Sequence, residues 1–297
     1  MRRRVWAAVG LVLAGWLAGG SRAADTPAEA TVTDAEGKEV KVTGLKFGAG
    51  TRRLAWLADP AGTTEDAKKG PLALELREPL STALKAGVVT YVPVASIESI
   101  KYDNDKKVAA VAVKGLADPL AGTLLYTNLN VLAFTGTADG KAAEFNGGPL
   151  KKGNIKAVAF PDAKPVAARK GGSAWLVQID QAKAENPTLK ASNFKFLYQF
   201  PGGVEVLTDT VAVRKGDPLK LDDAVKAFAP VVIEVNAHMA AVEVQTGDGP
   251  ERLVVVALQM EKGGKTGTLV GLLGEVDAGW KLFPLHTIKG MKRPKKD

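Results

Sequence analysis

Few residues in this chain could bind a metal or act as a general base. The two histidines, His238 and His286, stand 48 positions apart, and neither is followed two to four positions later by another metal-ligating side chain. The chain also has no cysteine that could complete a zinc site. We therefore expect no metal and no other cofactor, and we interpret both histidines as replaceable turn or surface positions.

Gly264-Lys265-Thr266 has the last residues of a phosphate-binding loop, but the spacing before it argues for a hairpin. The phosphate loop needs a glycine five residues before its second glycine, so that backbone amides can surround the phosphates. That position holds Gln259. Gly263 and Gly264 instead suit a tight hairpin, in which both central residues take a positive φ. We predict a hairpin at this point.

Carboxylates and serines show no catalytic spacing either. Asp103-Asn104-Asp105 spaces two carboxylates as a calcium loop does, but two lysines follow at once, and the glycine and distal glutamate of that loop are missing. Asp222 and Asp223 are adjacent, so their side chains point apart, and they suit the start of a short helix over 222–228. Ser173 lacks a nucleophile-elbow motif. The sequence thus assigns no catalytic, cofactor-binding or metal-binding residue.

The aromatic residues could stack on sugars or on a partner protein if they lay on one exposed face. Trp56, Trp175 and Trp280 have aliphatic neighbours, and aromatic residues of β-proteins mostly belong to the core. We expect all three tryptophans to be core residues. The tyrosines, on composition alone, are weaker candidates for partner contact: Tyr91, Tyr102, Tyr126 and Tyr198.

Residues 1–23 have the pattern of a cleaved secretory signal. Arginines at positions 2–4 precede an uncharged run from Val5 to Gly20, and Ser21-Arg22-Ala23 places small residues where a signal peptidase acts. The alternative is a retained membrane anchor, but this run is shorter than the roughly 20 residues that a spanning helix needs. We predict cleavage near Ala23 and a periplasmic or extracellular location.

The charge of the chain argues against a nucleic-acid partner. Loss of the four arginines of residues 1–23 lowers the formal net charge from +8 to +4, whereas nucleic-acid binders usually concentrate basic residues on one face. The only basic concentration is the C-terminal tail, with Lys289, Lys292, Arg293, Lys295 and Lys296. We interpret this tail as solvated and mobile, with weak electrostatic contact to a membrane surface as the alternative.

Most of the chain after residue 23 alternates between apolar and polar residues with a period of two, which is typical of strands with one buried face. The pattern is clearest in Val231–Val235, Ala241–Gln245 and Leu253–Leu258, which we interpret as an antiparallel meander continued by Leu269–Leu273. Helical signals are short, as in the segment from Pro79 to Ala86. The predicted class is all-β, with tandem small antiparallel β units and a few very short helices.

A short phrase recurs in the chain: a proline after an apolar residue, a polar stretch, and then two apolar residues three positions apart. It is clearest in Val92–Ile100 and Phe283–Met291, with looser copies that begin at Pro149 and Pro218. Proline suits the start or edge of a strand, the polar stretch suits one tight helical turn, and the isoleucine returns to a strand. Such a phrase is typical of repeated structural units.

This phrase resembles the closing segment of SH3-like and Sm-like small barrels, over about ten residues per unit. The chain as a whole resembles an exported bacterial-type β-repeat protein of unknown function. The resemblance implies SH3-like barrels, or a pair of β-sandwiches, and it carries over no functional residue.

The phrase and the loop-like stretches divide the chain into units. We predict a signal at 1–23, β units at 24–105, 106–161, 173–229 and 230–297, and a linker at 162–172. With no reactive constellation visible, the leading expectation is a non-enzymatic binding or scaffolding protein of the cell envelope, with an envelope protein or polysaccharide as its partner. A hydrolase acting on an envelope polymer and a purely structural spacer are the alternatives.

Overall fold

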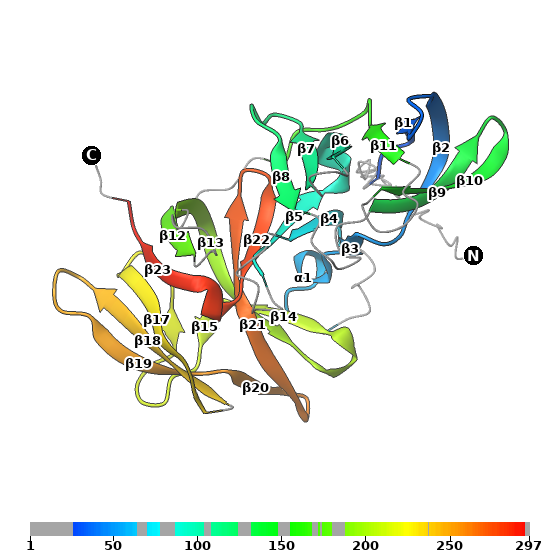
Figure 1. Ribbon diagram of the computed structural model, residues 1–297. Helices are drawn as coiled ribbons and strands as arrows, with labels where there is room; N and C mark the ends of the chain where they lie inside the picture. Colours follow the sequence, from blue (N-terminus) through cyan, green and yellow to red (C-terminus); the bar gives the residue numbers. More distant parts are fainter. Residues whose placement is uncertain are drawn as a thin grey trace, which may run out of the picture.

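A computed structural model of the chain shows an all-β protein built from antiparallel strand pairs (Figure 1), which confirms the predicted class. The structure describes residues 26–63, 70–77, 87–103, 108–123, 132–147, 155–167, 172, 174–179, 188–236 and 238–294. The predicted signal and the predicted helix from Pro79 to Ala86 lie outside these residues, as do Ser173, Tyr126 and most of Asp103-Asn104-Asp105.

Among the described residues, the strands form an eight-stranded sheet, a thirteen-stranded sheet and one two-stranded ribbon. The eight-stranded sheet runs, in spatial order, through β10 (Lys141–Gly147), β9 (Leu132–Ala138), β2 (Glu39–Phe47), β1 (Glu29–Asp34), β11 (Ile155–Ala159), β6 (Ile97–Asp103), β7 (Val108–Val113) and β8 (Leu120–Thr123).

The thirteen-stranded sheet contains most of the C-terminal part and three strands from the N-terminal part. Its path runs through β19 (Arg252–Ala257), β18 (Met239–Thr246), β17 (Val225–Asn236), β23 (Ile288–Lys292), β12 (Trp175–Ile179), β13 (Thr188–Gln199), β21 (Lys265–Val276), β22 (Gly279–Phe283), β5 (Val89–Pro93), β4 (Leu72–Arg77) and β3 (Thr51–Arg53). Beside this path, β14 (Glu205–Thr208) pairs with β13 and β20 (Gln259–Lys262) pairs with β21, while the ribbon consists of β15 (Thr210–Val211) and β16 (Leu219–Lys220).

The strands of residues 24–105 belong to both sheets: β1, β2 and β6 to the smaller one, and β3, β4 and β5 to the larger one. The division into four units therefore stays a prediction about folding units and does not describe the sheets. A four-residue helix, α1 (Ala55–Ala58), lies against the larger sheet near β14.

The two clear copies of the repeated phrase have the same local structure. In the first, β5 ends at Pro93, one turn of 3-10 helix, η2 (Val94–Ser96), follows, and β6 begins at Ile97. In the second, β22 is followed by η5 (Leu285–Thr287) and then by β23. The isoleucine that re-enters the strand is buried in both copies, as is the apolar residue three positions later. The strand, turn and strand predicted from the phrase are confirmed at these two places.

The hairpin predicted at Gly263 and Gly264 is also confirmed. Both glycines have a positive φ, and they connect β20 to β21 through the pair formed by Lys262 and Lys265. The meander of β17, β18 and β19 is present, but β21 does not pair with β19; it pairs with β13, β20 and β22.

The short helix predicted over 222–228 is wrong. Asp222 accepts a hydrogen bond from the backbone amide of Ala224 in a turn, and β17 begins at Val225. Strand pairing explains the difference, because β17 lies between β18 and β23 with Phe228 opposite both Val244 and Met291. Two hydrogen-bonded neighbours stabilise the extended backbone more than a single helical turn could.

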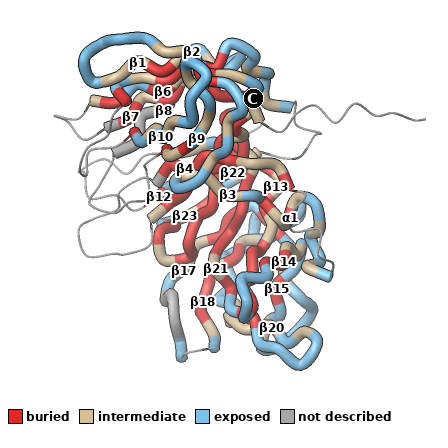
Figure 2. Tube along the Cα trace, turned by 90° about the vertical axis from the view of Figure 1, so that its right-hand side faces the viewer, coloured by how far each residue is buried: buried red, intermediate tan, exposed pale blue. Residues whose placement is uncertain are grey.

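One hydrophobic core connects the two sheets. Its members include Ile97, Ile100 and Val158 from the smaller sheet and Trp175, Phe228 and Met291 from the larger one. Figure 2 shows buried stretches along the strands of both sheets, with exposed residues gathered at hairpin ends such as that of β20 and β21. The strands of the larger sheet that lie next to the smaller one, β4, β5 and β22, define the place where a site between the two can form (Figure 1).

Candidate functional site

The N-terminal and C-terminal parts of the larger sheet meet where β5 pairs with β22. Tyr91 lies opposite Trp280, Thr90 opposite Lys281, and Val89 opposite Leu282. Thr90 and Lys281 hold the same position in the repeated phrase, three residues before its proline. β5 and β22 are the equivalent strands of the two copies, and they pair antiparallel with the equivalent residues Thr90 and Lys281 at the centre. This is the arrangement of a local two-fold axis.

Because strand side chains alternate between faces, this junction has two different surfaces. On the first surface, Val89 and Tyr91 of β5 and Leu282 of β22 form a small core with Trp56 of α1. The Trp56 ring is fully buried and packs edge-on against Tyr91 at 5.3 Å between centroids. This surface is closed by packing.

Arg52 covers the edge of the packed surface formed by Trp56 and Tyr91. Its guanidinium lies 5.0 Å from the centroid of Trp56 and 5.7 Å from that of Tyr91, within reach of a cation–π attraction. It donates a 2.6 Å hydrogen bond to Glu205 of β14 and lies 3.6 Å from Glu75 of β4. Arg52 therefore connects residues of the N-terminal part to β14 in the C-terminal part.

Burial changes the protonation equilibria of this ion pair. Burial raises the pKa of Glu205 above its usual value, and the attraction of Arg52 offsets only part of that rise. Burial lowers the pKa of Arg52, but Glu205, Tyr91 and Glu75 raise it by more, so it lies above its usual value. The raised pKa of Glu205 means that its surroundings disfavour the charged carboxylate, whereas the raised pKa of Arg52 means that its surroundings favour the charged guanidinium. The short hydrogen bond and the second carboxylate favour an ion pair that is formed at neutral pH.

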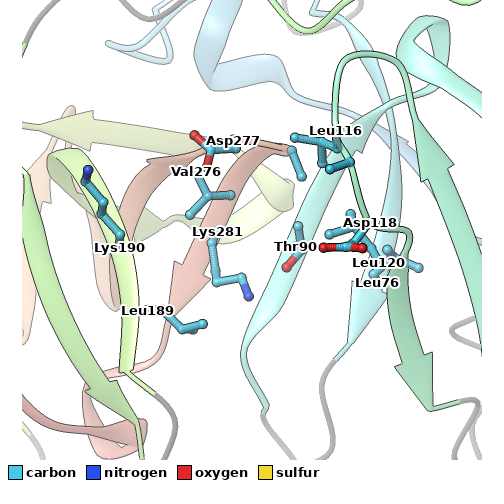
Figure 3. A pocket seen from close by; sticks show the side chains of 12 residues that line it. Leu76, Thr90, Leu116, Asp118, Leu120, Leu189, Lys190, Val276, Asp277 and Lys281 are labelled. Carbon is cyan, nitrogen blue, oxygen red and sulfur yellow. The ribbon is translucent and has the colours of Figure 1, made fainter.

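The opposite surface of the junction is the floor of a cleft with a volume of about 410 Å³ (Figure 3). Thr90 and Lys281 lie on this floor. One wall comes from the loop between β7 and β8, and the other from the start of β13 and the turn between β21 and β22. The residues that line the cleft are Leu76, Thr90, Leu116, Ala117, Asp118, Leu120, Leu189, Lys190, Val276, Asp277, Ala278 and Lys281.

The charged residues of the cleft are divided between its walls. Lys281 is only 7% exposed although it carries an ammonium group, and Figure 3 shows its side chain directed into the space in front of Thr90. Asp118 belongs to the opposite wall and points toward Thr90 from the other side. In the same view, the Asp277 carboxylate and the Lys190 ammonium point away from Lys281. The cleft thus has a buried base, Lys281, and an exposed acid, Asp118, on opposite sides.

A second hollow of about 370 Å³ adjoins the cleft, since Leu116 and Asp277 line both. Its remaining lining comes from Lys114, Gly115 and residues 165–167 of the predicted linker. The two hollows therefore lie side by side at the loop between β7 and β8 and the turn between β21 and β22.

The residues singled out from the sequence lie outside the cleft. His238 is exposed in the turn between β17 and β18, and His286 is in η5. Trp56 and Trp175 are buried as predicted, whereas Trp280 is only partly buried. Three of the four tyrosines are buried and do not form a contact surface, namely Tyr91, Tyr102 and Tyr198.

The basic tail is different from the solvated segment that was expected, at least as far as Arg293. The guanidinium of Arg293 lies 4.0 Å from the centroid of Trp175 and donates hydrogen bonds to the backbone oxygens of Asp222 and Val225. This arginine fixes the end of the described chain against β12 and β17, so it is a structural residue.

Sequence reasoning missed Thr90, Lys281 and Asp118. No sequence signal marked Lys281, because alternation with a period of two places a lysine between Trp280 and Leu282 on the face opposite those two apolar side chains. No local pattern could have paired it with Asp118, which is brought to the cleft by the smaller sheet.

Comparison with known proteins found no family model, no curated protein and no solved structure that matches this chain. Within the described residues, no helix is long and apolar enough to cross a membrane. No group of three or more histidine, cysteine, aspartate or glutamate side chains in that same part of the chain could hold a metal ion.

Proposed function

We propose that this chain is an exported, non-enzymatic binding protein of the cell envelope, and that the cleft over the β5–β22 junction holds its ligand. The observation that supports this proposal is the cleft itself: a concave, mostly apolar surface between two sheets, with a few polar groups directed inward. Ligand sites in proteins commonly have this composition, and they occur preferentially where two structural parts meet.

The predicted signal at 1–23 supports an envelope location, and an envelope protein or polysaccharide is the partner class that this location favours. Sequencing the N-terminus of exported protein tests the location directly. We expect the sequence Ala24-Asp25-Thr26, and an intact Met1 in a membrane pellet would contradict it.

Filling the cleft tests the binding function. Ala117 is exposed on the cleft wall, so Ala117→Trp should occupy the cleft without disturbing the core. Ala142→Trp is the matched control, because Ala142 is exposed on β10 and does not line the cleft. The probes are purified peptidoglycan sacculi, measured by co-sedimentation, and detergent-solubilised envelope proteins, measured by pull-down with residues 24–297.

We expect Ala117→Trp to reduce binding to at least one probe by tenfold or more, and Ala142→Trp to bind as the unchanged chain does. Equal binding by all three proteins, or no binding by any of them, would contradict the proposal. The latter result would favour the structural spacer.

A hydrolase remains the second candidate because two carboxylates, Asp118 and Asp277, line the same cleft, although only Asp118 is directed toward Thr90. Most glycosidases use two carboxyl groups to hydrolyse a glycosidic bond. Release of soluble fragments from sacculi by the unchanged chain, and its loss in Asp118→Asn or Asp277→Asn, would favour the hydrolase over the binding protein.

A further inference from the structure

We infer that the cleft takes a zwitterionic ligand with an apolar middle, of which a short apolar peptide with free termini is the simplest example. This inference rests on the proposed binding function and specifies the chemistry of the ligand. It is carried by the opposed charges inside the cleft and by the apolar side chains between and around them.

The charge pattern is the first part of the argument. Lys281 extends from the floor on the C-terminal side and Asp118 from the wall on the N-terminal side, with the Thr90 hydroxyl between them (Figure 3). A ligand carboxylate beside Lys281 and a ligand ammonium beside Asp118 would each find an opposite charge. Charge-assisted hydrogen bonds of this kind are stronger than neutral ones.

The burial of Lys281 is the second part. Its side chain projects from the same face of the junction as Val92 and Phe283, which are fully buried core residues. Keeping a cation at such a position costs desolvation energy, which an anionic neighbour offsets. Lysine has three N–H donors, so a ligand carboxylate can be added to the contact that Lys281 already makes.

The two-fold relation makes the placement of this charge specific. Thr90 is the equivalent of Lys281 in the other copy of the phrase, and the register places the two opposite each other. A symmetric junction would have identical groups on the two sides of the axis, whereas this one has a neutral hydroxyl on one side and a cation on the other. The two sides of the cleft therefore differ in charge, as recognition of a ligand with two different ends requires.

The lining between the charges is apolar, and its size suits a small ligand. Leu76, Leu116 and Leu120 contribute from the N-terminal side, and Leu189, Val276 and Ala278 from the C-terminal side. The volume of about 410 Å³ falls within the range of small-molecule sites, roughly 300–1,000 Å³. A purely anionic ligand would lie against Asp118 and a purely cationic one against Lys281, so either is disfavoured by like charge.

The test is isothermal titration of residues 24–297 with the peptide Ala-Leu-Ala in three forms: free, N-acetylated, and C-amidated. We expect the free form to bind, and each blocked form to bind about tenfold more weakly or worse, because one charge-assisted contact is lost.

Two variants test which residue binds which end of the ligand. Asp118→Asn should abolish the preference for the free form over the acetylated one, and Lys281→Met should abolish the preference over the amidated one. Asp118 is exposed, so its replacement should leave folding intact even if Lys281→Met does not fold. Asp139→Asn, at an exposed turn outside the cleft, is the matched control and should retain both preferences.

The outcomes separate this inference from the proposed function. Equal binding of the three peptide forms, or peptide binding that Ala117→Trp does not weaken, would overturn the inference. If no peptide form binds while Ala117→Trp still weakens binding to sacculi or envelope proteins, the proposed function stands and the zwitterionic ligand is wrong. If neither kind of binding is detected, both are wrong.

Discussion

At the scale of single residues, the ion pair of Arg52 and Glu205 has the most consequences. It connects positions 153 residues apart in the sequence and covers the aromatic pair of Trp56 and Tyr91. Glu205 is 7% exposed, while about a third of the Arg52 side chain is accessible to water. Removing only the cation would leave a buried carboxylate, and this cost generally exceeds the net stability that the pair provides.

We predict that Arg52→Met destabilises the protein more at pH 8 than at pH 5. Loss of Arg52 removes the charge that lowers the pKa of Glu205, so this pKa rises further above its unfolded value. At pH values between the unfolded and the folded pKa of Glu205, the folded state binds more protons than the unfolded state. The free energy of unfolding therefore falls as pH rises. Because water reaches the site, we expect a loss of about 2 kcal/mol at pH 8 in urea unfolding, below that of a fully buried pair.

The double variant Arg52→Met/Glu205→Gln is the control, because a neutral amide has no proton to exchange. The difference in unfolding free energy between the single and double variants should be larger at pH 8 than at pH 5. A difference that stays constant over this range would show that Glu205 is not the titrating group.

The candidate site illustrates what a sequence can show about single residues. Burial of Trp56 and Trp175 was predictable from their aliphatic neighbours, because burial follows residue type. The contacts of Lys281, Asp118 and Arg52 were not predictable, because each depends on strands that are distant in the sequence. Alternation shows which side of a strand a residue occupies, and strand order decides what it meets there.

At the scale of elements, the repeated phrase was the most informative part of the sequence. Both clear copies form a strand, a 3-10 turn and a strand, because proline ends the ladder and the turn returns an apolar side chain to the core. In the copy that begins at Pro218, a short strand, β16, and a turn at Asp222 precede β17. The phrase predicted local structure, but it could not predict that β5 and β22 would pair.

We predict that Ile97→Ala and Ile288→Ala each destabilise the protein by roughly 2–5 kcal/mol, the cost of removing a large apolar side chain from a packed core. Ile97 is fully buried and Ile288 is 4% exposed. Leu253→Ala is the control, since Leu253 is 65% exposed, and it should cost under about 0.5 kcal/mol. Urea midpoints that do not change for either isoleucine variant would contradict an equivalent core role.

We also predict that the β5–β22 junction depends on Gly279. Its φ is +136°, and a Cβ atom there would overlap the backbone oxygen of Tyr91. Gly279→Ala should cost about 3 kcal/mol or more, because steric overlap adds to backbone strain. Gly247→Ala is the control for strain alone: φ is +73° with no neighbour within 4 Å, so a loss of about 1–2 kcal/mol is expected. Equal losses in thermal unfolding would show that β5 and β22 do not need this close approach.

At the scale of the whole molecule, the two sheets share their interior. The main core contains residues from both sheets, and the smaller core joins Trp56 and Tyr91 to Leu197 and Leu273. Chains of this length commonly divide into separate domains. Here the strand pairing of β5 with β22, the ion pair of Arg52 with Glu205 and the shared core all connect the N-terminal and C-terminal parts.

We therefore predict that residues 24–297 unfold in one cooperative transition. Intrinsic fluorescence reports on Trp56 in the N-terminal part and on Trp175 and Trp280 in the C-terminal part, while far-ultraviolet circular dichroism reports on all strands. In a single transition the two urea midpoints coincide, and Gly279→Ala lowers both together, since it weakens the connection through which each part stabilises the other. If the two parts fold independently, the curves separate into two steps and Gly279→Ala moves only one of them. That result would contradict the shared core and would also make the cleft a space between two movable bodies, in which Lys281 and Asp118 have no fixed separation.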